Sequence, residues 1–232
     1  MKVEKPILSV IWLNYNSMGF INIAKASLEA IGNFEVPFEL ILVDNGSTDG
    51  SFKLLKEFVN ELDIKNVKVF KLNKNLGFTG GNNIGYMYSD PRSKYIVLIN
   101  NDLIPNSDSI RELVRYMNNH DNVGAVQGVI TDIFGKDIDN AGFLCSEALV
   151  NYPVTEPKEV PYAITYASGA YIVIRRRALE KIGKLFDWEG FMYFDDWPLG
   201  YRLWMHGYKV MSLPLLAGRH LGNASNKSEK II

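Results

Sequence analysis

The stretch YIVLINNDLIP, residues 95–105, decides the fold. Its first residues are apolar or aromatic, which is typical of a strand buried on both faces of a sheet. The run then ends in Asn100, Asn101 and Asp102. Polar groups at the end of a buried strand cost free energy unless something there binds them. We therefore predict a core strand whose carboxyl end carries a ligand site.

The composition is that of an ordinary globular domain: 232 residues, 47% hydrophobic, 22% charged and a net charge of −1. A chain with so little net charge has no overall field to recruit nucleic acid, so no nucleic-acid partner is expected. The single cysteine, Cys145, excludes an intrachain disulfide and favours a reducing compartment. Neither a signal peptide nor a bilayer-spanning stretch is recognisable. We expect a cytoplasmic protein, whose membrane contact, if any, is peripheral and at the inner face of the cell membrane.

Apolar strands and helical patterns alternate around this stretch. Runs of strand type occupy residues 7–13, 38–44 and 67–72, and helical spacing follows residues 17, 51 and 108. Such alternation predicts an α/β fold with a mainly parallel sheet covered on both faces. The Gly- and Asn-rich segment 73–85, NKNLGFTGGNNIG, is expected to be a loop.

Beyond about residue 120 the pattern is looser. Residues 123–130 are typical of a strand, and 131–161 read as an irregular segment. A strand and a short helix are expected within 166–183, an aromatic loop and a helix within 186–207, and a last short strand at 208–213. The basic run Arg175–Arg177 is expected at a solvated edge.

Every polar cluster of the first half follows a predicted strand: residues 14–16, 44–47, 73–83 and 100–102. The carboxyl ends of parallel strands share one edge of the sheet, where open α/β proteins bind ligands. This convergence is stronger evidence for a site than any single cluster, because each cluster alone is also typical of an ordinary turn.

Five acidic or histidine side chains are candidates for the chemistry. Asp102 can bind a hard cation that takes its other ligands from water and phosphate oxygens, and Asp44 can accept a hydrogen bond from a nucleobase N–H. One of Asp195 and Asp196, at a predicted helix start, can act as a general base, while the other can cap the helix. His220 can bind a metal through a neutral ring nitrogen. The structural alternatives are turn chemistry, helix capping and an ordinary histidine.

Taken together, the motifs resemble a known family. They are SVIWLNYNS (9–17), LVDNGSTDGS (42–51), NLGFTGGNNIG (75–85), LINNDLIP (98–105), SGAYIVIRRRALEKIG (168–183), FMYFDDWPLGYRLWMHGY (191–208) and His220. In this order they resemble the family 2 glycosyltransferases, most of all the rhamnosyltransferase-like branch. The resemblance extends from Leu8 to about His220, and the ordered set is much more specific than any member.

The resemblance implies a GT-A fold in a single domain, residues 1–220. A nucleotide-sugar-binding half would span about 1–105 and an acceptor and catalytic half about 106–220, followed by a polar tail at 221–232. It also implies an inverting sugar transfer assisted by Mg²⁺ or Mn²⁺. The donor would be a UDP- or dTDP-sugar, and the acceptor a glycan, a lipid-linked glycan or a protein.

The resemblance also assigns roles to residues. Asp196 matches the catalytic base, and Asp102 with His220 matches the metal site. The nucleotide side would comprise Leu13, Asn14, Tyr15, Asn16, Asp44, Asn45, Gly81, Asn82 and Asn101. The acceptor or sugar side would comprise Ser168, Gly169, Trp188, Tyr193 and Asp195.

Three positions depart from the family pattern. Asn100 replaces the first acid of the D-x-D motif, so metal affinity would depend more on the diphosphate. Asp195 stands where a glutamate is usual, and Pro198 where the branch often has a second aspartate, a change on the acceptor side.

Two other functions compete with this interpretation. A nucleotidyltransferase that makes sugar nucleotides would share the sheet and the metal, but would want a basic Gly-rich loop after the first strand, where this chain has NYNSMGF. An inactive sugar- or nucleotide-binding module is consistent with Asn100 and Pro198, whereas retention of both Asp102 and Asp196 argues for an enzyme. Binding of nucleoside diphosphates with and without Mn²⁺, followed by donor hydrolysis, discriminates among the three.

Overall fold

A computed structural model describes residues 6–148, 150–187 and 195–222. The predicted core strand is present as β4 (Tyr95–Asn100), and only its last residue, Asn100, is not fully buried. Strand β1 pairs with it in parallel on one side and strand β11 antiparallel on the other. The fold is the predicted α/β class, built on a mixed sheet in two halves that meet along β4.

The main sheet has the strand order β10-β12-β6-β11-β4-β1-β2-β3, with β5 paired to β12 and β7 to β6. Its strands are β1 (Leu8–Asn14), β2 (Phe38–Asp44), β3 (Val67–Lys71), β4, β5 (Leu103–Pro105), β6 (Val123–Asp132), β7 (Ile138–Asn140), β10 (Tyr162–Ala163), β11 (Tyr171–Arg175) and β12 (Lys209–His220). Strands β8 (Phe143–Cys145) and β9 (Asn151–Pro153) form a separate hairpin. The first half, β3-β2-β1-β4, is entirely parallel.

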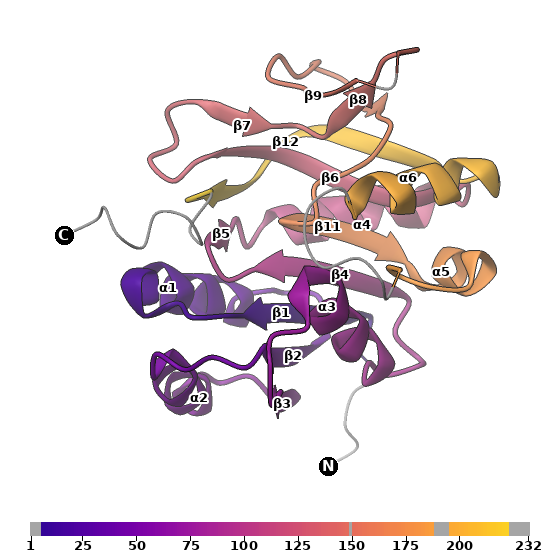
Figure 1. Ribbon diagram of the computed structural model, residues 1–232. Helices are drawn as coiled ribbons and strands as arrows, with labels where there is room; N and C mark the ends of the chain where they lie inside the picture. The colour runs from indigo at the N-terminus through magenta and orange to yellow at the C-terminus, as the bar shows by residue number, and fades with distance from the viewer. Residues whose placement is uncertain (1–5, 149, 188–194, 223–232) are drawn as a thin grey trace.

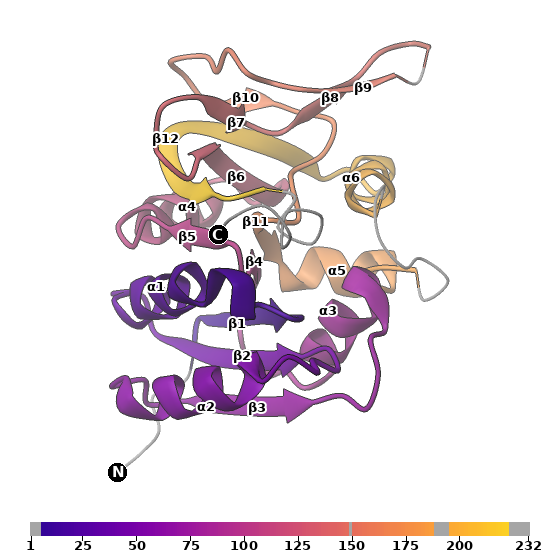
Figure 2. The ribbon, with the colours of Figure 1, turned by 60° about the vertical axis from the view of Figure 1, so that its left-hand side comes forward.

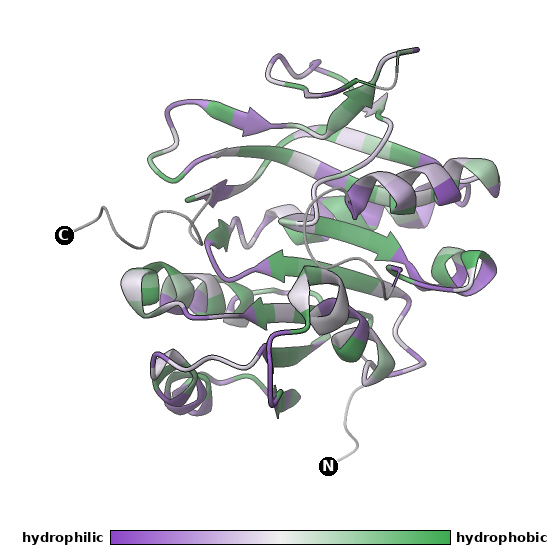
Figure 3. Cartoon of the chain, in the orientation of Figure 1, coloured by the Kyte–Doolittle hydropathy of each residue, from purple (hydrophilic) through white to green (hydrophobic). Residues whose placement is uncertain are grey.

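Helices cover both faces of the sheet, which makes three layers (Figures 1 and 2). Alternate residues of each central strand enter two separate apolar cores, because successive side chains of a strand point to opposite faces. One core is closed by α1 (Ile21–Gly32), α2 (Ser51–Glu61) and α4 (Ser109–Asn119). A 3₁₀ turn, η1 (Met18–Phe20), directly precedes α1. The other core is closed by α3 (Gly77–Met87), α5 (Arg176–Ile182) and α6 (Asp196–Met205). The inner strands are accordingly the most hydrophobic part of the chain (Figure 3).

The prediction of a loop at residues 73–85 is wrong, because most of this segment is helix α3. Gly77 has a φ of 73° at the turn that enters the helix, whereas Gly81 and Gly85 serve close packing. A Cβ added at Gly81 would lie 2.3 Å from Leu13 Cδ1, and one at Gly85 would lie 2.4 Å from Ile11 Cγ2. Glycines four residues apart lie on one helix face, so they let α3 approach β1 closely.

Two further expectations about the second half are corrected. The last strand is not short, since β12 extends over 12 residues and follows β6 to its end. The segment 131–161 is not wholly irregular, since it contains β7, β8 and β9. Short strands that pair with distant partners carry little local periodicity, which is why the sequence pattern missed them.

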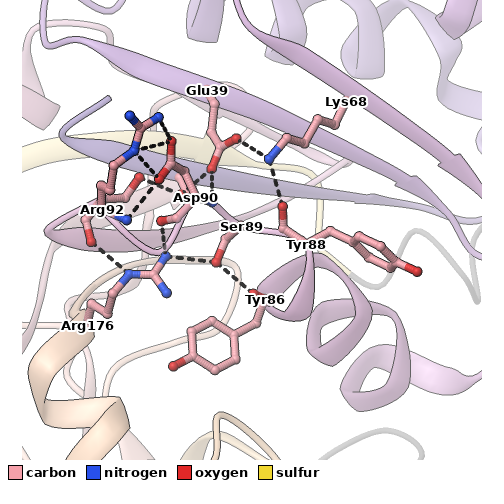
Figure 4. Close-up of polar contacts among 10 residues, drawn as sticks. Glu39, Lys68, Tyr86, Tyr88, Ser89, Asp90, Arg92 and Arg176 are labelled. Carbon is pink, nitrogen blue, oxygen red and sulfur yellow. Dashed lines mark hydrogen bonds and ion pairs between the residues drawn. The ribbon is translucent and has the colours of Figure 1, made fainter. Parts of the chain in front are cut away.

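The expectation of a solvated edge at Arg175–Arg177 holds only for Arg177, which is exposed, since Arg175 and Arg176 are buried. The Arg175 guanidinium donates to the carbonyl oxygens of Met117, His120 and Val123. That of Arg176 donates to the carbonyls of Ser93 and Asp90 and to Ser89 Oγ (Figure 4). Both side chains therefore satisfy carbonyl groups of turns at the edge opposite the polar strand ends.

Next to Arg176, a buried carboxylate joins the amino ends of three strands (Figure 4). Glu39 accepts a hydrogen bond from Ser9 Oγ at 2.6 Å and forms an ion pair with Lys68 at 2.8 Å. It also accepts a hydrogen bond from the backbone N–H of Asp90. This network stabilises the edge of the sheet opposite the polar strand ends, where Glu39 and Arg176 have structural partners. No described helix is long and apolar enough to cross a membrane.

We predict that Gly85→Ala destabilises the protein by about 1–3 kcal/mol, the usual cost of overpacking a filled core. The added methyl group would clash with Ile11, whose branched side chain is fully buried. Urea unfolding monitored by circular dichroism measures the change. Gly32→Ala is the control, because a Cβ there would lie 3.7 Å from Ile64, an ordinary contact. Equal stability of the two variants would contradict the packing role of Gly85.

Candidate active site

The candidate site lies at the carboxyl ends of β1, β2 and β4, where the sequence predicts it. Asn14 ends β1 and is paired in register with Asp44, the last residue of β2. Its neighbour Leu13 is in register with Asn100 of β4. The polar ends of three parallel strands are thus brought to a single edge of the sheet.

A single buried amide connects these strand ends. Asn14 Nδ2 donates to Asp44 Oδ1 at 2.8 Å, while Asn14 Oδ1 accepts from Asn101 Nδ2 at 3.0 Å and from Ser17 Oγ at 2.7 Å. Asp44 Oδ2 in turn accepts from the backbone N–H of Ser47 at 3.0 Å. Asn14 and Asp44 are fully buried. Because the amide of Asn14 has partners on both sides, it orients Asp44 and Asn101 relative to each other.

The neighbouring loop residues differ in what they offer a ligand. Tyr15 is 42% exposed and presents its ring to solvent. Asn16 has a φ of 44°, a left-handed conformation that asparagine tolerates, and accepts a hydrogen bond from Thr48 N. Asn45 is buried and holds the turn before α3, because its amide bonds Asn75, Leu76 and Gly77.

The remaining predicted residues of the nucleotide side are involved in packing. Gly81 and Leu13 form the close contact between α3 and β1. Asn82 is buried, and its amide donates to Phe78 O within the same helix. The structure therefore brings seven of the nine predicted nucleotide-side residues to one edge, with Gly81 and Asn82 in the helix packed against β1, and Tyr15 is the most exposed of the nine.

Asp102 and His220 meet at the same edge, although 118 positions of sequence separate them. His220 Nε2 lies 3.2 Å from Asp102 Oδ1, and the backbone N–H of Leu221 donates to Asp102 O. The antiparallel pairing of β5 with the end of β12 makes this contact, with His220 in register with Leu103. The structure therefore brings together the two residues predicted for the metal site, and their role as ligands stays a prediction.

Asp139 is a member of this group that the sequence did not reveal. His220 Nδ1 lies 2.9 Å from Asp139 Oδ2, so the imidazole bridges two carboxylates. Burial lowers the pKa of His220, but hydrogen bonds and charge attraction from Asp102 and Asp139 outweigh it and raise the pKa to about 9. Asp139 lies in β7, within the segment read as irregular, and its only signal is the polar stretch around it.

The chemistry of this pair fits a divalent cation. A carboxylate oxygen and an imidazole nitrogen are both ligands of Mn²⁺, and Mg²⁺ is usually held by one or two carboxylates plus water and phosphate oxygens. Asp102 and Asp139 contact different nitrogens of the imidazole ring, and the described residues contain no group of three or more His, Cys, Asp or Glu side chains that could hold one ion. Two protein ligands would therefore leave most of the coordination shell to a bound diphosphate and water.

The predicted general base lies beside the end of β4. Asp196 Oδ2 accepts a hydrogen bond from the backbone N–H of Gly169 at 2.9 Å. The next residue, Ala170, accepts through its carbonyl from Asn100 N at 3.0 Å. The turn before β11 therefore connects the carboxylate of α6 to the polar end of the central strand.

Gly169 is the residue type that this approach requires. A Cβ at that position would lie 2.5 Å from Asp196 Oδ1 and 2.7 Å from Phe78 Cζ. Although part of the residue remains accessible, the Asp196 carboxyl is dehydrated by its surroundings, and burial raises its pKa to about 7. The Gly169 N–H works against that rise and the charge of Asp195 adds to it. The carboxyl can therefore exchange a proton near neutral pH.

The other residues predicted for the acceptor side have mixed outcomes. Asp195 precedes α6 but makes no side-chain capping bond, so the expectation that it caps the helix is wrong. Burial, with the charge of Asp187, raises the pKa of Asp195. Ser168 is buried in the turn before β11. Trp188 and Tyr193 lie outside the described residues.

Solved structures of other proteins share this fold. The mannosyltransferase PcManGT from Pyrobaculum calidifontis, in complex with GDP-Man and Mn²⁺, aligns with a TM-score of 0.72 and 18% identity, covering 96% of this chain and 59% of its own. S. aureus TarS 1-349 in complex with UDP-GlcNAc aligns with a TM-score of 0.70 and 18% identity, covering 94% of this chain and 61% of its own. The architecture is the predicted GT-A fold.

Curated relatives are similar over shorter segments. An uncharacterized glycosyltransferase of Haemophilus influenzae is 28% identical over 115 residues, 50% of this chain and 44% of its own length. The minor teichoic acid biosynthesis protein GgaA of Bacillus subtilis is 33% identical over 100 residues, 41% of this chain and 21% of its own. The alignments thus span less than half the length of either relative.

The family assignment rests on a longer match than these. Residues 9–183, which include the polar strand ends, Gly169 and Arg175–Arg177, match the model of glycosyl transferase family 2. This chain therefore belongs to glycosyl transferase family 2.

Proposed function

We propose that the chain transfers a sugar from a nucleoside-diphosphate sugar to an acceptor hydroxyl, with inversion at the anomeric carbon. The observation that carries this proposal is the Asp196 carboxyl. It is held by the Gly169 N–H, its pKa is raised to about 7, and the adjoining turn is bonded to Asn100, the last residue of β4, two positions before Asp102. Such a transfer needs a general base for the acceptor hydroxyl and a carboxylate that can bind a metal ion together with the diphosphate. Asp196 and Asp102 offer these two groups at one edge of the sheet.

The donor would bind across the ends of β1 and β2. Tyr15 is exposed and can lie against the face of a nucleobase, and Asp44 would accept from a base N–H if the loop 45–48 moves to uncover it. Asn101, which the Asn14 amide orients, is suited to donate to a phosphate or ribose oxygen. A pyrimidine nucleotide such as UDP or dTDP is the donor class we propose.

Asp102 and His220 would hold Mg²⁺ or Mn²⁺ together with the donor diphosphate. When bound, the ion would offset negative charge on the leaving diphosphate. Asn100, in the place of another acid, leaves the protein with fewer negative ligands at this point. We therefore propose that metal and nucleotide bind with strong mutual dependence.

The transfer itself would be a single displacement. The acceptor oxygen attacks the anomeric carbon and forms the new glycosidic bond, while the bond from that carbon to the diphosphate oxygen breaks. Asp196 takes the proton of the attacking hydroxyl. A base with a pKa near 7 is ionised at neutral pH and still basic enough to draw this proton in the transition state.

The relatives suggest which acceptors to test. The solved neighbours hold UDP-GlcNAc or GDP-Man, and one curated relative is named for teichoic acid biosynthesis. We propose a glycan or polymer acceptor, lipid-linked glycans included, reached from the cytoplasm at the inner face of the cell membrane. The rhamnosyltransferase-like branch stays a prediction about the donor sugar. Family membership disfavours the nucleotidyltransferase alternative, and the experiments below test the inactive module.

We predict that Asp196→Asn lowers kcat by about 10²–10⁴-fold, the usual loss when general-base catalysis is removed. The amide keeps the shape of the side chain but cannot accept the proton. In the unmodified chain, kcat should fall below a pH of about 7, where Asp196 becomes protonated. Initial rates against donor concentration and pH measure both effects, after a library of nucleotide sugars and acceptors has identified a working pair.

The matched control is Asp195→Asn, which changes the adjacent carboxylate. We expect it to cost less in kcat than Asp196→Asn. Near-normal turnover in Asp196→Asn would remove the base assignment, and the reverse ranking of the two variants would transfer that role to Asp195.

We predict that the same Asp196→Asn substitution stabilises the metal-free protein at pH 8. The raised pKa means that the folded state binds a proton more strongly than the unfolded chain, so stability falls as pH rises from about 4 to about 7. The variant lacks this penalty and should gain roughly 2–4 kcal/mol at pH 8, with little change at pH 4, since one pKa unit is worth about 1.4 kcal/mol. Urea unfolding at both pH values, in the presence of a chelator, measures the gain.

The exposed Asp63 supplies the control, because Asp63→Asn removes a carboxylate that stays in water. Its effect on stability should be small and alike at the two pH values. A gain for Asp196→Asn that does not depend on pH would show that the Asp196 carboxyl is not dehydrated in the fold.

We predict that Asp102→Ala removes the part of nucleoside-diphosphate binding that depends on divalent metal. Calorimetry with UDP, dTDP and GDP, each with Mn²⁺ or with a chelator, measures it. Asp108→Ala is the control, since Asp108 is an exposed acid six residues along the chain. If Asp102→Ala binds the nucleoside diphosphate with the same affinity and the same metal dependence, Asp102 is not a metal ligand. The assignment of Asp196 as the base would not be affected by that result.

A further inference from the structure

Gln127 is a buried amide in the middle of β6, with polar partners in two directions. The residue is fully buried. Its Oε1 accepts from the backbone N–H of Ser168 at 2.6 Å, and its Nε2 donates to Asn140 Oδ1 at 2.9 Å and to Gly128 O at 3.1 Å. A polar side chain at such a place costs desolvation, which these hydrogen bonds offset.

The first direction leads to the candidate base. Ser168 precedes Gly169, whose N–H donates to Asp196. Gly169 has no side chain, so nothing of its own anchors this peptide, and a Cβ there would collide with Asp196. The hydrogen bond from Ser168 to Gln127 lies one residue before the donor that Asp196 uses. The orientation of that donor therefore depends on Gln127.

The second direction leads to the candidate metal group. Asn140 Nδ2 lies 3.4 Å from Asp139 Oδ2, and the same oxygen lies 2.9 Å from His220 Nδ1. His220 then contacts Asp102. Asn140 and Gln127 are both buried, so water does not compete for their hydrogen bonds. The chain of contacts from Asp102 to Asp196 passes through Gln127.

We propose that Gln127 is a positioning residue for Asp196, setting the Ser168–Gly169 turn that holds the carboxylate and connecting it to the Asp102–His220 group. The proposal deepens the proposed function and rests on it for the role of Asp196. In this proposal, Asp196 and the Asp102–His220 group belong to one hydrogen-bonded network. Its central residue, Gln127, lies on β6 in the second half of the sheet.

Gln127→Met tests the proposal, because methionine is similar in length and flexibility but makes none of the three hydrogen bonds of the Gln127 amide. The Ser168 N–H then loses its acceptor, so the Gly169 N–H should bond Asp196 less well. A weaker bond to the ionised form raises the pKa of a carboxyl, here by about one unit, the size expected when a charged hydrogen bond is weakened. Among the described residues, Asp195 and Tyr166 are the other titratable groups that act on Asp196, and the substitution changes neither.

Two readouts measure the effect. Carbon-13 NMR titration of the side-chain carboxyl groups, with the Asp196 signal assigned by its absence in Asp196→Asn, reads the shift without any substrate. The pH profile of kcat should move upward by the same amount, so activity lost at pH 7 returns at pH 8. The KM for the donor should stay unchanged, because the donor contacts of β1 and β2 are not altered.

Ser212→Ala is the matched control. Ser212 lies on β12 in register with Gln127, is fully buried, and its hydroxyl has no hydrogen-bond partner among the described residues. We expect it to leave both readouts unchanged. Should Gln127→Met fail to fold, Asn140→Ala, which removes the acceptor that orients the Gln127 amide, should shift the Asp196 titration in the same direction.

Two outcomes distinguish the positioning role of Gln127 from the proposed sugar transfer. A lower melting temperature with an unmoved Asp196 titration in the variant would make Gln127 merely structural and overturn the proposal. A shifted titration in a protein that transfers no sugar would support the positioning role and sink the proposed function instead.

Discussion

The Asn14 amide is the interaction on which the donor side of the site depends. It is fully buried at the point where β1, β2 and β4 end, and it bonds Asp44 in one direction and Asn101 in the other. A side chain with both a donor and an acceptor is required there, since the carboxylate needs a donor and the amide of Asn101 needs an acceptor. Removing either function would leave a buried polar group unpaired, at a cost of about 1–3 kcal/mol.

The antiparallel strand β11 joins this donor side to the second half of the sheet. It lies between β4 and β6, so the turn that precedes it arrives at the same edge at which the parallel strands end. Strand β12 then runs parallel to β6 and returns His220 to that edge. A mixed sheet can therefore place residues from both halves together, whereas a purely parallel sheet of this length would need another crossover helix.

The burial of Asp196 illustrates how such a site trades stability for reactivity. The environment that raises the pKa of its carboxyl also makes the ionised form costly in the folded protein. Gly169 limits this cost with one backbone hydrogen bond, and only a glycine leaves room for the carboxyl to approach. At the opposite edge, Glu39, Asp90 and Arg176 have hydrogen-bond and ion-pair partners (Figure 4).

The sequence by itself determined the alternation of buried strands with helices, the core strand at 95–100, and the polar residues that end the strands, because these are local patterns of period and polarity. It also pointed to Asp102, Asp196 and His220, through motifs whose order resembles a family. Only the tertiary structure decided that the glycines of 77–85 pack a helix, that Arg175 and Arg176 are buried, and that Asp139 and Gln127 connect the site. Each of these depends on a partner far along the chain, such as Ile11 for Gly85 or His220 for Asp139, and no local pattern carries that information.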